Sequence, residues 1–118
     1  MPTRKELGDQ GEQQALVFLT AQRLVLLERN YRCAGGEIDL VMRDGEVLVL
    51  IEVRLRHSDH YGGAAASVTA SKQRRLITAA GKLLQQRPAY RRYRMRFDLV
   101  ALSDLHATPQ WIKDAFRA

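Results

Sequence analysis

The chain has little cysteine, no long apolar segment and, over a long central stretch, no acidic residue. Its 118 residues include one cysteine, Cys33, so no intrachain disulfide can form. No apolar run approaches the roughly 18 residues of a membrane-spanning helix, and the first residues lack the apolar core of a signal peptide. These absences argue against a disulfide-stapled secreted scaffold and a helical membrane anchor. They predict a cytoplasmic protein with no membrane partner.

Acidic residues are missing from residue 60 to residue 97. Nine of the 19 lysines and arginines lie in this stretch. The rest of the chain holds the other ten and all thirteen acidic residues, so its net charge is negative. Such a block is either a solvated surface or a polyanion-binding surface, and its one-sided charge favours the second. We therefore predict a nucleic-acid partner, with DNA as the leading candidate. The expected contacts are Lys72, Arg74, Arg75, Lys82, Arg91 and Arg92.

The length and the 46% hydrophobic content predict one domain over residues 1–118. Apolar periodicity and turn residues predict the order helix, three strands, helix, strand, short helix. The fold class is therefore α/β, with a central mixed sheet flanked by helices on both sides. The predicted helices are 5–22, about 69–87 and 109–116, and the predicted strands are 24–31, the two arms of a hairpin over 37–55, and 95–102.

Two arms of the predicted hairpin each carry acids within an apolar run, which is costly unless the charge is compensated. An Asp44-Gly45 loop of two residues would place Asp39 across from Leu50 and Glu37 across from Glu52. Because side chains alternate faces, Glu37, Asp39, Glu52 and Arg54 would then share one face. Asp39 and Glu52 would be diagonal neighbours, close enough for both carboxylates to bind one divalent cation.

Several of these residues have a second, purely structural interpretation. Glu52 can pair with Arg54 while Glu37 lies in water, and spacing alone leaves this alternative and the metal site equally open. Glu12 is either a third site acid brought by the first helix or an exposed first-turn acid. The pair His57 and His60 is too sparse to favour a zinc site. Asp98 is interpreted as a structural acid that pairs with nearby arginines.

The combined motifs resemble the YraN-type family of small bacterial proteins, over nearly the whole chain. The matching segments are Gly8-Asp9-Gln10-Gly11-Glu12, Gly36-Glu37-Ile38-Asp39-Leu40, Ile51-Glu52-Val53-Arg54, Tyr61-Gly62-Gly63, Lys72 and Arg96-Phe97-Asp98-Leu99-Val100. That family looks like a branch of the restriction-endonuclease-like (PD-(D/E)XK) superfamily, similar to archaeal Holliday-junction resolvases. The resemblance implies a nuclease-like domain that hydrolyses phosphodiester bonds in DNA, with branched or structured DNA as a candidate substrate.

The resemblance also implies roles for individual residues. Asp39, Glu52 and the Val53 carbonyl would bind Mg²⁺ or Mn²⁺, Glu12 would be the added helix acid, and Glu37 and Gln73 would lie around the ligands. Arg54 stands where the superfamily usually has lysine, and arginine stays protonated, so it cannot serve as a general base. Two functions therefore remain open, a metal-dependent endonuclease and a non-catalytic nucleic-acid-binding module. A homodimer is compatible with either.

Overall fold

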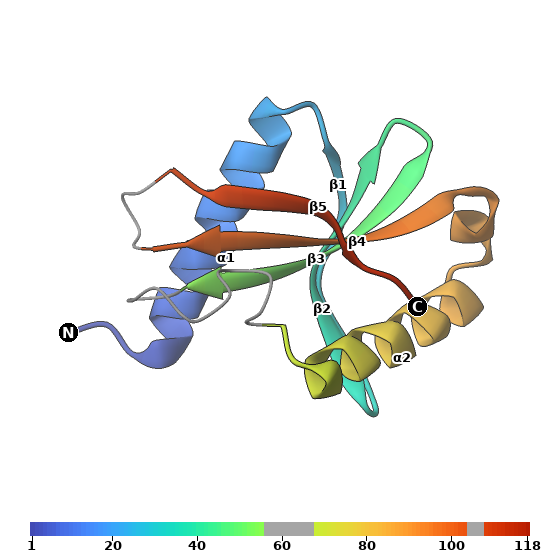
Figure 1. Cartoon of the computed structure of the whole chain (residues 1–118), viewed down its shortest axis with the longest axis horizontal. Helices are drawn as coiled ribbons and strands as arrows, with labels where there is room; N and C mark the ends of the chain where they lie inside the picture. Colours follow the sequence, from blue (N-terminus) through green and yellow to red (C-terminus); the bar gives the residue numbers. More distant parts are fainter. Residues whose placement is uncertain (56–67, 104–107) are drawn as a thin grey trace.

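Five strands form one mixed sheet with a long helix on each face (Figure 1). The computed structural model describes residues 1–55, 68–103 and 108–118. The α/β architecture predicted from the sequence is confirmed. The elements in chain order are α1 (Arg4–Ala21), β1 (Val25–Cys33), β2 (Gly36–Asp44), β3 (Val47–Leu55), α2 (Ala70–Gln86), a 3-10 turn η2 (Pro88–Arg92), β4 (Arg94–Leu102) and β5 (Gln110–Phe116).

Threonine side chains cap both helices at their N-termini. The Thr3 hydroxyl accepts a hydrogen bond from the Glu6 amide at 3.1 Å, and the Thr69 hydroxyl accepts one from the Lys72 amide at 3.2 Å. Each cap satisfies an amide that the helix itself leaves without an acceptor. Pro88 follows α2 closely, as expected of a residue that cannot continue a helix. No helix of the described residues is long and apolar enough to cross a membrane.

The strands lie in sequence order, antiparallel except for the parallel pair β3 and β4, which α2 connects. Both faces of the sheet are buried. On one face α1 contributes Ala15 and Leu19, which pack against Leu40, Met42, Val49 and Ile51. On the other face α2 contributes Leu76, Ala79, Ala80 and Leu83, which pack against Tyr31, Ile38, Val41, Leu48 and Leu50. Glu52 therefore lies on a strand between two apolar layers.

The predicted hairpin register is wrong by two residues. The loop is Gly45-Glu46, and the ladder runs from Asp44 across from Val47 to Leu40 across from Ile51. Glycine occupies the first loop position with φ +61, a conformation it adopts without strain. Val41, rather than Asp39, faces Leu50, and Glu37 pairs with Arg32 of β1 rather than standing across from Glu52. A shift of two keeps the parity, so the predicted common face for Asp39 and Glu52 survives.

The predicted helix over 109–116 is wrong, because this segment is strand β5. Its apolar residues have helical spacing in sequence, but a register irregularity opposite Phe97–Leu99 changes the phase of the strand. Asp114, with φ +53, lies in the irregular part. Trp111 consequently packs on the α1 side, whereas Ile112, Ala115 and Phe116 pack on the other side. A β-bulge of this kind imitates a helical pattern.

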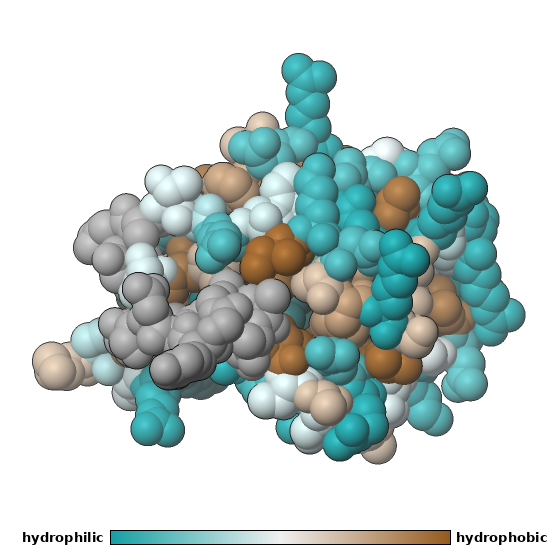
Figure 2. Space-filling model, in the orientation of Figure 1, coloured by the Kyte–Doolittle hydropathy of each residue, from teal (hydrophilic) through white to brown (hydrophobic). Residues whose placement is uncertain are grey.

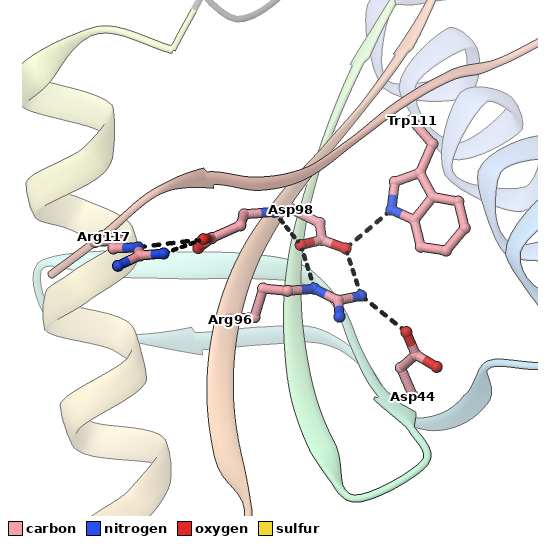
Figure 3. A network of polar contacts seen from close by, with 6 residues as sticks. Asp44, Arg96, Asp98, Trp111 and Arg117 are labelled. Carbon is pink, nitrogen blue, oxygen red and sulfur yellow. Dashed lines mark hydrogen bonds and ion pairs between the residues drawn. The ribbon is translucent and has the colours of Figure 1, made fainter.

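A buried polar network ties β5 to the sheet (Figure 3). Asp98 is 1% exposed and accepts hydrogen bonds from Arg96 Nε at 2.8 Å, Trp111 Nε1 at 2.9 Å and the Asp114 amide at 2.9 Å. Arg96 also pairs with Asp44 at 3.0 Å. The interpretation of Asp98 as a structural acid is confirmed.

Candidate functional site

The acids of the candidate site lie where β2 and β3 separate. Their ladder ends at Leu40 and Ile51, and Asp39 and Glu52 are the next residue on each strand. Asp39 Oδ2 accepts a hydrogen bond from the Val53 amide at 2.8 Å. A side-chain oxygen thus satisfies a β3 amide that lies beyond the last pair of the β2–β3 ladder. Beyond this point β3 runs along α1 while β2 turns toward the start of α2 (Figure 1). The neighbouring apolar residues follow this bend, because Ile38 packs on the α2 side and Leu40 on the α1 side.

Three carboxyl groups from three elements influence one another here. Burial and the neighbouring Asp39 raise the pKa of Glu52 to about 8. Burial, followed by Asp39 and Asp9, raises the pKa of Glu12 to about 7. Burial also raises the pKa of Asp39 to about 6, although the Val53 amide opposes the rise. The structure thus brings Glu12, Asp39 and Glu52 together as a group of poorly compensated acids.

Glu12 reaches the group from the third turn of α1. Its carboxyl is half-buried, and its Oε1 is a buried side-chain oxygen that lacks a hydrogen-bond partner within the described residues. Its position inside the group agrees with the interpretation of Glu12 as a site acid and not with the exposed first-turn alternative. A buried polar atom without a partner is unusual in a folded protein and suggests a place for a water, an ion or a substrate group.

Positive charge approaches the acids from α2 and from β3. Lys72 Nζ lies 4.0 Å from Glu52 Oε1, with the two side chains 41% and 15% exposed. Arg54, on β3, partly opposes the rise in the pKa of Asp39 and of Glu52. Lys72, Arg75, Leu76, Glu37 and Glu52 line a small cavity of about 50 Å³. This volume suits a few water molecules beside the carboxylates.

The approach of α2 explains one glycine of the Gly36-Glu37-Ile38-Asp39-Leu40 segment. Gly36 is buried, and a Cβ at this position would collide with the Arg75 carbonyl oxygen. Any larger residue would push the first turns of α2 away from β2. Glycine therefore lets Lys72 and Arg75 come down to the acids.

Glu37 lies at the edge of the small cavity, where its side chain is exposed and Arg32 Nε lies 3.5 Å from its carboxylate. The remaining predicted residues lie at other places. The Gln73 amide donates to the Val68 carbonyl at 3.1 Å, at the start of α2. Arg74 and Lys82 lie on the exposed side of α2, and Arg91 donates to the Leu84 carbonyl at 3.0 Å. Arg92 is the last residue of η2, at the opposite end of β3 from Glu52. His57, His60 and Tyr61-Gly62-Gly63 lie outside the described residues.

The placement of Lys72 beside Glu52 is the feature that sequence reasoning missed, since the prediction for Lys72 was a phosphate contact. Its only sequence signal is a position in the first turn of a capped helix, which says nothing about the distance to β3.

The donor set suits a hard cation, although it is small. Among the residues that the structure describes, no group of three or more His, Cys, Asp or Glu side chains is placed to hold a metal ion. Mg²⁺, however, binds through one or two carboxylates and keeps several waters. Asp39 and Glu52 meet that requirement, and the unpartnered oxygen of Glu12 could accept from such a water.

The comparison with known families agrees with the motif resemblance. A family described as "Uncharacterised protein family UPF0102" matches residues 11–102, which include Glu12, Asp39, Glu52 and Lys72. The chain belongs to the UPF0102 family. A UPF0102 protein of Alkalilimnicola ehrlichii is 52% identical over 113 residues, covering 96% of this chain and 88% of the relative. UPF0102 proteins of Janthinobacterium sp. (strain Marseille) and Pseudomonas putida (strain GB-1) are 51% and 47% identical, each over 98% of this chain and 92% and 94% of the relative.

Proposed function

We propose that this UPF0102 protein is a Mg²⁺- or Mn²⁺-dependent nuclease of the restriction-endonuclease-like superfamily that hydrolyses phosphodiester bonds in DNA. Branched or structured DNA is the candidate substrate. The observation that supports this proposal best is the group Glu12, Asp39 and Glu52, whose raised pKa values come from burial and mutual repulsion. Carboxyl groups with perturbed pKa values cluster at functional sites, where burial and like charges shift them.

Each residue of the group has a distinct task. Asp39, Glu52 and the Val53 carbonyl would bind the ion, which supplies polarisation of the phosphate and activation of water. Glu12, with a pKa of about 7, can accept a proton near neutral pH and return it. Arg54 can pair with a phosphate oxygen and stabilise negative charge that develops on it. Lys72, whose Nζ lies 4.0 Å from Glu52, would supply from α2 an ammonium that the residue after Val53 does not.

The experiment is a cleavage assay on linear duplex, single-stranded and four-way-junction DNA with Mg²⁺ or Mn²⁺. Asp39→Asn and Glu52→Gln should each abolish cleavage and reduce cation binding in isothermal titration, while circular dichroism stays native. Asp114→Asn is the matched control, because it removes one exposed carboxylate at a position with φ +53 that asparagine tolerates. Cleavage retained by Asp39→Asn, or no divalent-cation binding by the unaltered protein, would contradict the proposal.

A non-catalytic nucleic-acid-binding module is the second candidate. Arg54 favours it, because a guanidinium at this position can bind phosphate but cannot take a proton. Arg54→Lys separates the two candidates. A nuclease should keep or gain activity with the superfamily's usual residue, whereas a binding module should bind DNA with the same affinity and cut nothing in either form.

A further inference from the structure

A second hollow lies at the opposite end of β3 from the acids. It has a volume of about 780 Å³, and its walls are the Gly45-Glu46 loop, Arg43, Arg92, Tyr93 and Arg94. Hydrophilic side chains crowd this margin of the molecule in Figure 2, where Figure 1 places the β2–β3 loop and the turn before β4. We call Arg43, Arg92, Tyr93 and Arg94 together the arginine hollow.

Two of its guanidinium groups are held in place by neutral partners. The Arg92 guanidinium carbon lies 4.8 Å from the centroid of the Tyr93 ring, and Arg92 Nη2 donates to the Tyr93 hydroxyl at 2.7 Å. Arg43 Nη1 donates to the Gly45 carbonyl at 3.0 Å. These contacts fix position without cancelling charge. The charges are therefore oriented before a ligand arrives, which lowers the entropic cost of binding.

The arginine hollow differs in this respect from the other arginines nearby. Arg87, Arg96 and Arg117 each lie within 3.0 Å of a carboxylate oxygen, on Glu28, Asp44 or Asp98, and Asp114. Over the described ranges, no ion pair joins Arg43, Arg92 or Arg94 to an acid. The only acid in the wall is the exposed Glu46, so three positive charges face one negative charge.

We propose that the arginine hollow binds a phosphate group of the same nucleic-acid strand that reaches the acids, an inference that rests on the proposed function. Arginine forks match phosphate oxygens in pairs, and the hollow is large enough for a nucleotide. Val47, at its edge, and Glu52 are five residues apart on β3, about 17 Å at about 3.3 Å per residue. One DNA strand spans that distance in about five nucleotides at about 3.4 Å each. A second phosphate contact at this separation would fix the direction of the strand relative to the acids.

The test is fluorescence anisotropy with a labelled duplex of about 20 base pairs at several salt concentrations, in EDTA to prevent cleavage. Arg43→Ala/Arg94→Ala should lower the slope of log K against log salt by about 0.9, because one phosphate contact is lost. The affinity near physiological salt should fall about tenfold or more. Arg4→Ala/Lys113→Ala is the matched control, because it removes two exposed positive charges outside the hollow and should leave the slope unchanged.

Glu46→Gln should change the DNA affinity in the opposite direction, and a loss of folding would not produce such an increase. This substitution removes the one acid of the wall from an exposed loop position, so DNA binding should become tighter. If the arginine variant behaves like its control, or Glu46→Gln changes nothing, the proposal is overturned. If poly-glutamate competes as well as an oligonucleotide of equal charge, the ligand is an acidic peptide and the assignment to nucleic acid is wrong.

The outcomes also separate this inference from the proposed function. If the unaltered protein binds and cleaves DNA but the arginine variant matches its control, the hollow proposal fails and the nuclease proposal stands. Binding that depends on Arg43 and Arg94 in a protein that cuts no DNA would support the hollow and overturn cleavage.

Discussion

One sheet carries two groups of acids, one around the buried Asp98 and one at the half-buried Asp39 and Glu52, and the two are built in opposite ways. Around Asp98, donors arrive from a guanidinium, an indole and a backbone amide, all within 3.0 Å (Figure 3). Around Asp39 and Glu52, the part of the chain that the structure describes supplies one backbone amide, which donates to Asp39 at 2.8 Å, and one cation within 4.0 Å of Glu52, Lys72. The residue types are the same, so the difference lies in the number of donors.

That difference separates an acid that stabilises the fold from one that is available to a ligand. A buried carboxylate surrounded by donors is stable as an anion and has no reason to exchange its partners. Carboxylates that lack donors repel one another and lower the stability of the fold, unless a cation or a proton joins them. Mutations in the two groups should therefore have opposite effects on stability.

The largest effect is expected at Asp98. Asp98→Ala removes one of the two carboxylates that pair with the half-buried Arg96 and leaves the Trp111 indole and the Asp114 amide without that acceptor. Loss of one partner of a buried ion pair costs about 3–5 kcal/mol. Urea unfolding should show this loss in the free energy of unfolding. A loss below about 1 kcal/mol would mean that the network contributes little, and the contrast between the two groups would disappear.

Lys72→Ala tests whether Lys72 acts together with Glu52. Removing the ammonium should lower cleavage about ten- to a hundredfold, the usual cost of losing a group that supports a metal ligand. The same change removes a positive charge that competes with the cation, so Mg²⁺ should bind more tightly in isothermal titration. Lys113→Ala is the control, because Lys113 is an exposed lysine on β5 that is not among the predicted nucleic-acid contacts. A parallel loss of cation binding and cleavage would assign Lys72 to folding instead.

Asp39→Asn and Glu52→Gln should each raise the free energy of unfolding of the metal-free protein by about 0.5–2 kcal/mol, the range common for stabilising substitutions. Each variant removes a buried charge that its neighbours repel, and asparagine keeps an oxygen for the Val53 amide. Chemical unfolding in EDTA measures the effect, with Asp98→Asn as the opposite case. Destabilisation by both site variants would mean that the site acids are compensated as well as Asp98.

The sequence was sufficient to predict the common face of Asp39 and Glu52, because side chains repeat every two residues along a strand. The actual loop is one residue further along than predicted, which shifts the register by two and leaves the faces of the paired residues unchanged. The pairing of Asp98 was also predictable, since Arg96 lies two residues away on the same strand face.

Two features could not be predicted from the sequence: the close packing of α2 against the sheet and the bulge in β5. Nothing local to Lys72 indicates that α2 comes down onto β3, because that contact depends on the missing side chain of Gly36, about 36 residues earlier. Likewise, the apolar spacing of β5 has a helical period because a bulge at Asp114 interrupts the strand. The sequence pattern predicted a helix at β5, so it could not indicate that the Trp111 indole and the Asp114 amide donate to Asp98.

We expect a pH dependence of stability that belongs to the site acids alone. Their pKa values are about 6 for Asp39, 7 for Glu12 and 8 for Glu52 in the folded protein, above the ordinary values near 4 that an unfolded chain has. Between about pH 4 and pH 8 the folded state therefore binds more protons than the unfolded state. By linkage, the contribution of these acids to stability falls as the pH rises through that window and is greatest below it.

The contribution of Glu52 is isolated by subtracting the unfolding free energies of Glu52→Gln from those of the unaltered protein at each pH. This difference should show the upper part of the fall, up to about pH 8. Mg²⁺ should reverse it, since only the deprotonated acids bind the ion and its stabilising effect grows with pH. A difference curve that is flat in EDTA would show that Glu52 is as well compensated as Asp98, and the contrast between the two groups would then rest on donor geometry alone.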